Sequence, residues 1–97
     1  MAIKVIVELQ AKPGGRDELA ALLEGVLAQL GPRATGYLGS QRYAVVDNPD
    51  GLVEIAEWES AAARQAHMEE AAATGAYAPL MQALSAPPRA TVISQLP

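Results

Sequence analysis

Cysteine is absent from this 97-residue chain, and histidine occurs only once. The lack of cysteine excludes disulfides, thiolate nucleophiles, iron–sulfur clusters and cysteine-held zinc together. A single histidine also excludes a multi-histidine metal site within one chain. Composition leaves haem or an ion held by carboxylates open, although no residue spacing indicates either of them. We therefore expect a protein that uses no cofactor and no metal.

Basic charge and long apolar runs are also scarce. The formal net charge is -4 and there is no run of lysine or arginine, so the electrostatic signature of a nucleic-acid or anionic-membrane binder is missing. No stretch approaches the roughly 18 apolar residues of a membrane span, and no signal-peptide pattern is present. We expect a cytoplasmic protein that binds neither nucleic acid nor membrane.

Aromatic residues make up only 4% of the chain, and phenylalanine is missing. Hydrophobic residues nevertheless amount to 51%, which is enough to build a core. The length fits a single domain over residues 1–97, and domains of this size bury a modest share of their surface. Association with a second copy would bury more of it.

Hydrophobic periodicity in the first third of the chain predicts a strand followed by a helix. Residues 3–11 nearly alternate and are rich in β-branched side chains, as strands are. Pro13-Gly14-Gly15 ends this strand, and a helix begins near Arg16 with acidic residues in its first turn. Leucine and valine at 19, 22, 23, 26, 27 and 30 share one helical face, and Gly31-Pro32 supplies the stop.

The rest of the chain predicts a hairpin, two helices and a last strand. Residues 37–46 and 52–59 suit strands joined by a loop at 47–51. Ser60 is a good N-cap for a helix that runs to about residue 74 and ends at Gly75. A short amphipathic stretch and two prolines precede a fourth strand at 89–96. The stretch has its larger side chains on one face: Tyr77, Leu80, Met81 and Leu84.

This order of elements predicts a ferredoxin-like α+β fold of the βαββαβ type, with a four-stranded antiparallel sheet covered by helices on one side. The uncovered side would mix apolar and charged side chains, and such a face usually meets a partner. We predict a homodimer in which two sheets pack face to face. The side chains assigned to that face are Ile6, Leu38, Val46, Val53, Ile55 and Ile93, among Lys4, Glu8 and Arg42.

Four segments and one histidine, in order and at about the right spacing, resemble the antibiotic-biosynthesis-monooxygenase family. They are residues 11–19 (AKPGGRDEL), 36–40 (GYLGS), 47–49 (DNP), 56–60 (AEWES) and His67. The resemblance covers nearly the whole chain and implies a dimeric α/β barrel. Its members include cofactor-independent monooxygenases that oxidise anthrone- or quinol-like aromatic compounds, haem-degrading enzymes and a phospho-sugar isomerase.

The resemblance also implies a ligand pocket between the helices and the sheet, lined by Trp58. Four positions earlier, aromatic-oxidising members have an asparagine, whereas this chain has Glu54. The haem-degrading branch combines a first-strand asparagine with the tryptophan and an iron-ligating histidine. Here the first strand has no asparagine and only Gln10 as a side-chain amide, which argues against haem degradation.

Three side chains are the main candidates for chemistry, each with a structural alternative. Trp58 could stack on an aromatic substrate or anchor the second helix to the sheet. His67 has an ordinary pKa near neutrality, which suits a general acid or base, but it could instead pair with Glu70 or Glu59 at the surface. Glu54 could accept a proton if burial raises its pKa, or it could face water at a strand edge.

Alternation along the second strand places Tyr37, Gln41 and Tyr43 on one face and Arg42 on the other. Tyr37 and Tyr43 are therefore candidates for binding substrate, and Tyr43 could hydrogen-bond a substrate oxygen. Tyr77 and Met81 could form a flexible pocket wall. Structural roles are the alternative for all of them.

Our leading functional hypothesis is a cofactor-independent monooxygenase for a small anthrone- or quinol-like aromatic substrate. Glu54 or His67 takes a proton, Trp58 holds the ring, and the resulting carbanion reacts with O2. One alternative is a non-catalytic, ligand-binding or structural dimer, for which a sealed interior is expected. Another is an acid/base isomerase of the same fold, for which a polar, charge-lined cavity is expected.

Overall fold

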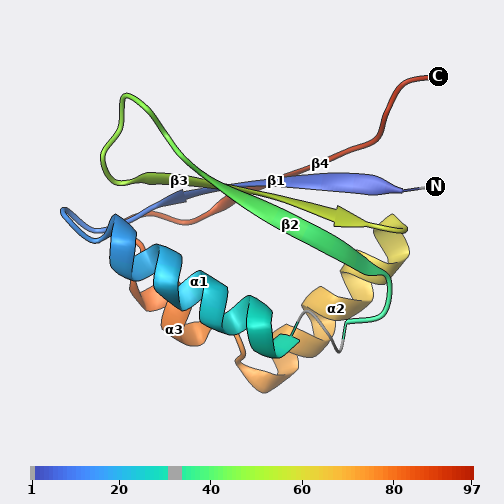
Figure 1. The fold of residues 1–97 in the computed structure, drawn as a ribbon. Coiled ribbons are helices and arrows are strands. Elements are labelled where there is room, and N and C mark those ends of the chain that lie inside the picture. The colour runs from blue at the N-terminus through green and yellow to red at the C-terminus, as the bar shows by residue number, and fades with distance from the viewer. Residues whose placement is uncertain (1, 31–33) are drawn as a thin grey trace.

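Four strands form one antiparallel sheet with its helices on one face (Figure 1). The strands are β1 (Ile3–Gln10), β2 (Tyr37–Ala44), β3 (Gly51–Trp58) and β4 (Arg89–Ile93), in the spatial order β2-β3-β1-β4. The helices are α1 (Arg16–Leu30), α2 (Ala61–Thr74) and α3 (Ala78–Gln82). This computed structural model describes residues 2–30 and 34–97. The predicted ferredoxin-like α+β fold is confirmed.

Local capping explains where α2 lies. The Ser60 hydroxyl accepts a hydrogen bond from the backbone N–H of Ala63 at 3.1 Å, which satisfies a donor that the first helical turn leaves free. Gly75 ends the helix in the left-handed conformation with φ 68, which glycine adopts at little cost. Both ends of α2 agree with the sequence prediction. The stop predicted for α1 at Gly31-Pro32 lies outside the described residues.

The last strand is shorter than the sequence predicted because it runs out of a partner. Ile93 pairs with Lys4, one residue from the start of β1 at Ile3, so residues 95–97 extend beyond the end of the neighbouring strand. At the other end of β1, Ala11 forms an isolated bridge with Leu84. This bridge fixes the chain between α3 and β4 against the sheet.

A β-bulge near the start of β2 reverses the facing of its later residues. Tyr37 pairs with Trp58, but Gly39 pairs with Glu57, so one residue is left over between them. The extra residue moves every following side chain to the opposite face. The prediction that Tyr37, Gln41 and Tyr43 share a face is therefore wrong. Gly39 has φ 128, and a glycine within a strand is a common sign of a bulge.

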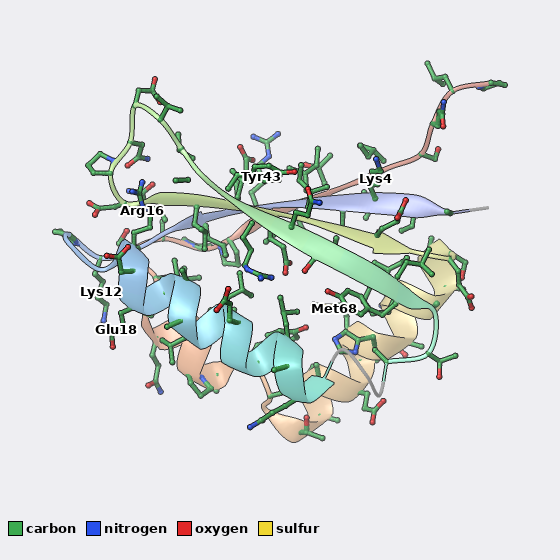
Figure 2. All side chains as sticks on the ribbon, in the orientation of Figure 1. Lys4, Lys12, Arg16, Glu18, Tyr43 and Met68 are labelled. Atoms are coloured by element: carbon green, nitrogen blue, oxygen red, sulfur yellow. The ribbon has the colours of Figure 1, made fainter. Side chains whose placement is uncertain are left out.

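The face of the sheet away from the helices, called here the bare face, carries several apolar side chains. Ile6 and Ile55 lie opposite each other on β1 and β3, and Ile93 is 40% exposed on β4. Arg42, predicted on this face, lies on the helix side because of the bulge. Tyr43 and Lys4 point away from the helices (Figure 2).

None of the described helices is long and apolar enough to cross a membrane.

The core on the helix side consists of two clusters of buried residues. One joins β1, α1 and α3 and includes Leu9, Leu19, Leu23 and Leu80. The other joins β1 and β3 and consists of Ile3, Val5, Ala56 and Trp58. A cytoplasmic location stays a prediction.

Gly36 offers a test of the packing between α2 and the sheet. Its φ is 86, and a Cβ atom placed on it would lie 2.7 Å from the Cβ of Ala63. We expect Gly36→Ala to lower the free energy of unfolding by about 1–3 kcal/mol, measured by urea denaturation. Gly25→Ala is the matched control because, among the described residues, a Cβ atom there would have no neighbour within 4 Å apart from its own stretch of helix, and it should raise helix stability by about 0.5–1 kcal/mol. Equal stability of the Gly36 variant and the wild type would contradict this packing.

Candidate active site

A cavity of about 280 Å³ lies between the sheet and the helices. This volume is close to the lower end of the roughly 300–1,000 Å³ typical of ligand pockets. Every helix and strand of the described residues contributes to its wall, and most of the lining is apolar. Its charged or aromatic polar side chains are Tyr37, Glu54, Arg64, His67 and Tyr77. An apolar ring with one or two polar groups is the kind of ligand that suits such a wall.

Trp58 ends β3 with its indole turned toward the helices. The residue is 5% exposed, and it faces inward because it shares one face of the strand with Ala56 and Glu54, two and four residues earlier. Its ring centroid lies 5.2 Å from that of Tyr37 in an edge-to-face arrangement and 5.1 Å from that of His67. The indole therefore belongs both to the core and to the cavity wall.

Glu54 is the buried carboxyl group of this site, with only 8% of the residue exposed. Its Oε2 atom is buried and has no hydrogen-bond partner among the described residues. Burial raises the pKa of Glu54, while the charge of Arg42 and a hydrogen bond from Ser40 partly offset this effect. A carboxylate with a raised pKa in the wall of an apolar cavity can accept a proton from a ligand.

Ser40, the β2 residue that hydrogen-bonds Glu54, also has two side-chain partners on its own strand. The Tyr37 hydroxyl donates a hydrogen bond to Ser40 Oγ at 2.8 Å, and Arg42 Nη1 lies 3.5 Å from the same atom. The Arg42 guanidinium also donates to Glu24 Oε1 at 3.2 Å, in a partly exposed ion pair with α1. Because part of the guanidinium is bound by Glu24, Arg42 does not neutralise Glu54 fully.

His67 and Tyr77 form a hydrogen-bonded pair across α2 and the turn before α3. The distance from His67 Nε2 to the Tyr77 hydroxyl is 2.9 Å. Burial lowers the pKa of His67, opposed by the charge of Glu70, and the charge of Arg64 lowers it further. Burial, with the charges of Glu54 and Tyr37 next, raises the pKa of Tyr77 to about 12. Both side chains are therefore neutral near pH 7.

The structure gathers most of the predicted site residues around one cavity. Trp58, Glu54, His67, Tyr37, Tyr77 and Met81 all line it. Tyr43 does not, since it lies on the bare face and donates a hydrogen bond to Gln41 Oε1 at 2.6 Å. For His67, the alternative from sequence is a surface pairing with Glu59 or Glu70. Among the described residues, its hydrogen bond is instead with Tyr77.

Sequence reasoning missed Arg64, Met68, Ser40 and Arg42 as neighbours of this site. Arg64 and Met68 stand three residues before and one after His67, so the helical period could have placed them on the same side of α2. Met68 lies on the helix side of the sheet (Figure 2). Met81, which is 47% exposed, gives the wall a second flexible thioether side chain.

The site offers little to a metal ion. Within residues 2–30 and 34–97, no group of three His, Cys, Asp or Glu side chains is placed to hold one. The Nε2 atom of His67 is bonded to Tyr77, which leaves Glu54 as the one carboxyl group among the described residues that line the cavity. The chemistry that these side chains can perform is proton transfer and hydrogen bonding to a ligand.

The raised pKa of Glu54 predicts a pH dependence of stability. The folded protein keeps this proton to a higher pH than the unfolded chain, whose ordinary value is 4.5. Stability from this group is therefore complete below that pH and falls as the pH rises through the folded pKa. Glu54→Gln stays neutral, so its free energy of unfolding should rise relative to that of the wild type as the pH is raised from about 4.5 through the folded pKa. Urea denaturation across this range measures the gap.

The matched control for this experiment is Glu57→Gln. Glu57 lies on the same strand and is exposed on the bare face, so its replacement removes one charge without changing the cavity. Its stability curve should run parallel to that of the wild type. A parallel curve for Glu54→Gln as well would contradict the raised pKa.

Comparison with known proteins gives one family and a set of similar folds. The antibiotic biosynthesis monooxygenase family model matches residues 2–78. The structure of Rv0793 from Mycobacterium tuberculosis is 23% identical, with 100% of this chain and 97% of that chain covered and a TM-score of 0.80. Comparison with curated protein sequences gave no significant match.

Two further similar structures come from Streptomyces. SnoaB from Streptomyces nogalater, described as a cofactor-independent oxygenase, is 13% identical over 97% of this chain and 92% of that chain, with a TM-score of 0.81. The monooxygenase from the gene ActVA-Orf6 of Streptomyces coelicolor, in complex with nanaomycin D, is 20% identical over 99% of this chain and 88% of that chain, with a TM-score of 0.83. At these identities the likeness concerns the fold.

Proposed function

Because the chain belongs to the antibiotic biosynthesis monooxygenase family, we propose that it is a cofactor-independent monooxygenase for a small aromatic substrate of the anthrone or quinol type. The observation that carries this proposal is the Glu54 side chain, which lines an apolar cavity beside Trp58 and has a buried Oε2 atom without a partner among the described residues. The oxygenase described as cofactor-independent and the complex with nanaomycin D, both of similar fold, support it.

For an anthrone, Glu54 removes one proton from the methylene carbon between the rings. The carbanion transfers electrons to O2 and forms a carbon–oxygen bond, giving a peroxide that loses water to leave a ketone. One oxygen atom of O2 stays in the product and the other leaves as water. The methylene group supplies all four electrons, so no further reductant is needed. Trp58 offers a flat apolar surface against which the ring system can stack.

Glu54 suits the role of base better than His67 does. The Nε2 atom of His67 is engaged by Tyr77 at 2.9 Å, whereas Glu54 has a free oxygen atom. The largely apolar wall also favours an aromatic substrate over the polar substrate of an isomerase. A sealed interior, expected for a purely structural protein, does not agree with a cavity of about 280 Å³.

The test is oxygen uptake by the purified protein in the presence of anthrones and quinols. We expect uptake above the rate of spontaneous oxidation at the same pH, with one O2 consumed for each anthraquinone formed from anthrone. A buffer blank and heat-denatured protein correct for oxidation that the protein does not catalyse. Uptake no faster than these blanks across the whole panel would contradict the proposed activity.

We further propose that two copies associate through the bare face of the sheet. Helices cover only the other face (Figure 1), while Leu38 and Ile93 on the bare side are 55% and 40% exposed. Burying such a face against a second copy removes apolar surface from water. Sedimentation velocity should show a dimer for the wild type and a monomer for Ile55→Glu. A monomeric wild type would contradict the proposed association.

A further inference from the structure

We propose that Tyr77 donates a hydrogen bond to the carbonyl oxygen of the substrate, and that His67 is a positioning residue that acts through Tyr77. The inference rests on the proposed function and adds a second polar contact opposite in character to Glu54. Tyr77 lies in the turn between α2 and α3 and lines the cavity. Its hydroxyl lies 2.9 Å from His67 Nε2.

A neutral tyrosine and a neutral histidine can share this hydrogen bond in two ways. Either the Tyr77 hydroxyl donates to Nε2, or an Nε2–H group donates to the Tyr77 oxygen and leaves the hydroxyl proton free. In the empty cavity both arrangements make one hydrogen bond. Once a ligand oxygen arrives, the second arrangement makes two, one from His67 to Tyr77 and one from Tyr77 to the ligand. Each bond polarises and strengthens the other.

The packing around His67 holds its ring in place for this role. The Trp58 ring centroid lies 5.1 Å from that of His67, and the Tyr77 ring centroid lies 6.1 Å from it in an edge-to-face arrangement. A ring held between two others loses little further freedom when Nε2 donates to Tyr77. His67 thereby leaves the hydroxyl proton of Tyr77 free to be donated to a ligand oxygen in the cavity.

The proposed roles of Glu54 and Tyr77 in the reaction are complementary. Removing a proton from the methylene carbon of an anthrone moves negative charge through the conjugated rings onto the carbonyl oxygen across the central ring, and a donor already aimed at that oxygen stabilises the charge. The Tyr77 hydroxyl is close enough to Glu54 to be affected by its charge. One wall of the cavity thus accepts the proton, and another binds the oxygen that becomes negative.

Ligand binding tests this assignment without turnover. Trp58 is the only tryptophan, so quenching of its fluorescence reports binding under anaerobic conditions. Anthrone and 9,10-dihydroanthracene have nearly the same shape, but only anthrone has a carbonyl oxygen. The wild type should bind anthrone about 5- to 10-fold more tightly, which is the usual effect of one hydrogen bond. Tyr77→Phe should bind both compounds equally.

The positioning role of His67 predicts a separate set of results for variants of this residue. His67→Phe should lose most of the preference for anthrone, whereas His67→Gln, whose amide N–H group can replace Nε2–H, should keep it. In the Tyr77→Phe background, His67→Phe should change nothing further. Tyr43→Phe is the matched control, since it removes a tyrosine hydroxyl on the bare face. Urea midpoints close to that of the wild type show that each variant is folded.

Several results would overturn the inference. They are a wild type without preference for anthrone, a preference that survives in Tyr77→Phe, and an effect of His67→Phe that is undiminished in the Tyr77→Phe background. Failure of the oxygen-uptake assay would instead overturn the proposed function. The two failures are distinguishable because anaerobic binding needs no oxidation.

Discussion

Glu54→Gln is expected to lower kcat for anthrone oxidation by about 10²- to 10⁴-fold, the usual contribution of a general base. Glutamine has nearly the same shape and fits the same place in β3, but its amide cannot take up the substrate proton. KM should change little because the cavity wall keeps its form. Oxygen uptake under saturating substrate measures kcat for both proteins.

The pH profile gives this prediction a second readout. In the wild type, kcat/KM should rise with pH as Glu54 loses its proton, at a pH above the ordinary glutamate value because burial raises its pKa. The residual rate of Glu54→Gln should lack this rise. Glu57→Gln, on the opposite face of the same strand, should behave as the wild type. Wild-type kcat in Glu54→Gln would transfer the role of base to another group.

Trp58→Ala is expected to lower the free energy of unfolding by about 3–5 kcal/mol. The indole is 5% exposed and packs in one cluster with Ile3, Val5 and Ala56, so its removal leaves a large void next to the cavity. Urea denaturation measures the change. Val46→Ala is the control, because Val46 is fully exposed and its replacement should stay within about 0.5 kcal/mol of the wild type.

Trp58→Phe separates the packing role of this residue from its role toward a ligand. Phenylalanine keeps an aromatic ring in the cluster, so the loss of stability should be smaller than for alanine. If Trp58 only anchors the helices, anthrone oxidation should survive this substitution unchanged. A rise in KM in a stably folded Trp58→Phe variant supports stacking of the ring on the substrate.

The elements that sequence predicted best depend on local chemistry. Ser60 and Gly75 cap α2 by interactions within a few residues, so composition and spacing were enough to place both ends. The ends of β4 depend on where β1 stops offering partners, which no local pattern reports. The facing of β2 depends on one extra residue at its start, and simple alternation could not detect it.

In the candidate site too, some features follow from local sequence and others depend on tertiary packing. Glu54 and Trp58 stand four residues apart on one strand, so the period of two correctly placed them on one face. The bond between His67 and Tyr77 depends on how the chain turns at Gly75 and on how α3 meets α1. Such a contact arises from tertiary packing, and neither residue's immediate sequence contains a sign of it.

Engineering of a new substrate preference can be confined to every second residue of β3. Positions 52, 54, 56 and 58 face the helices, whereas 53, 55 and 57 face the other way. A mutant library built on positions 54, 56 and 58 of the first set reshapes the cavity wall and leaves the opposite surface untouched. A library built on the second set changes the bare face and leaves the cavity untouched. Substrate preference and the properties of the bare face can therefore be optimised in parallel, and the substitutions then combined in one gene.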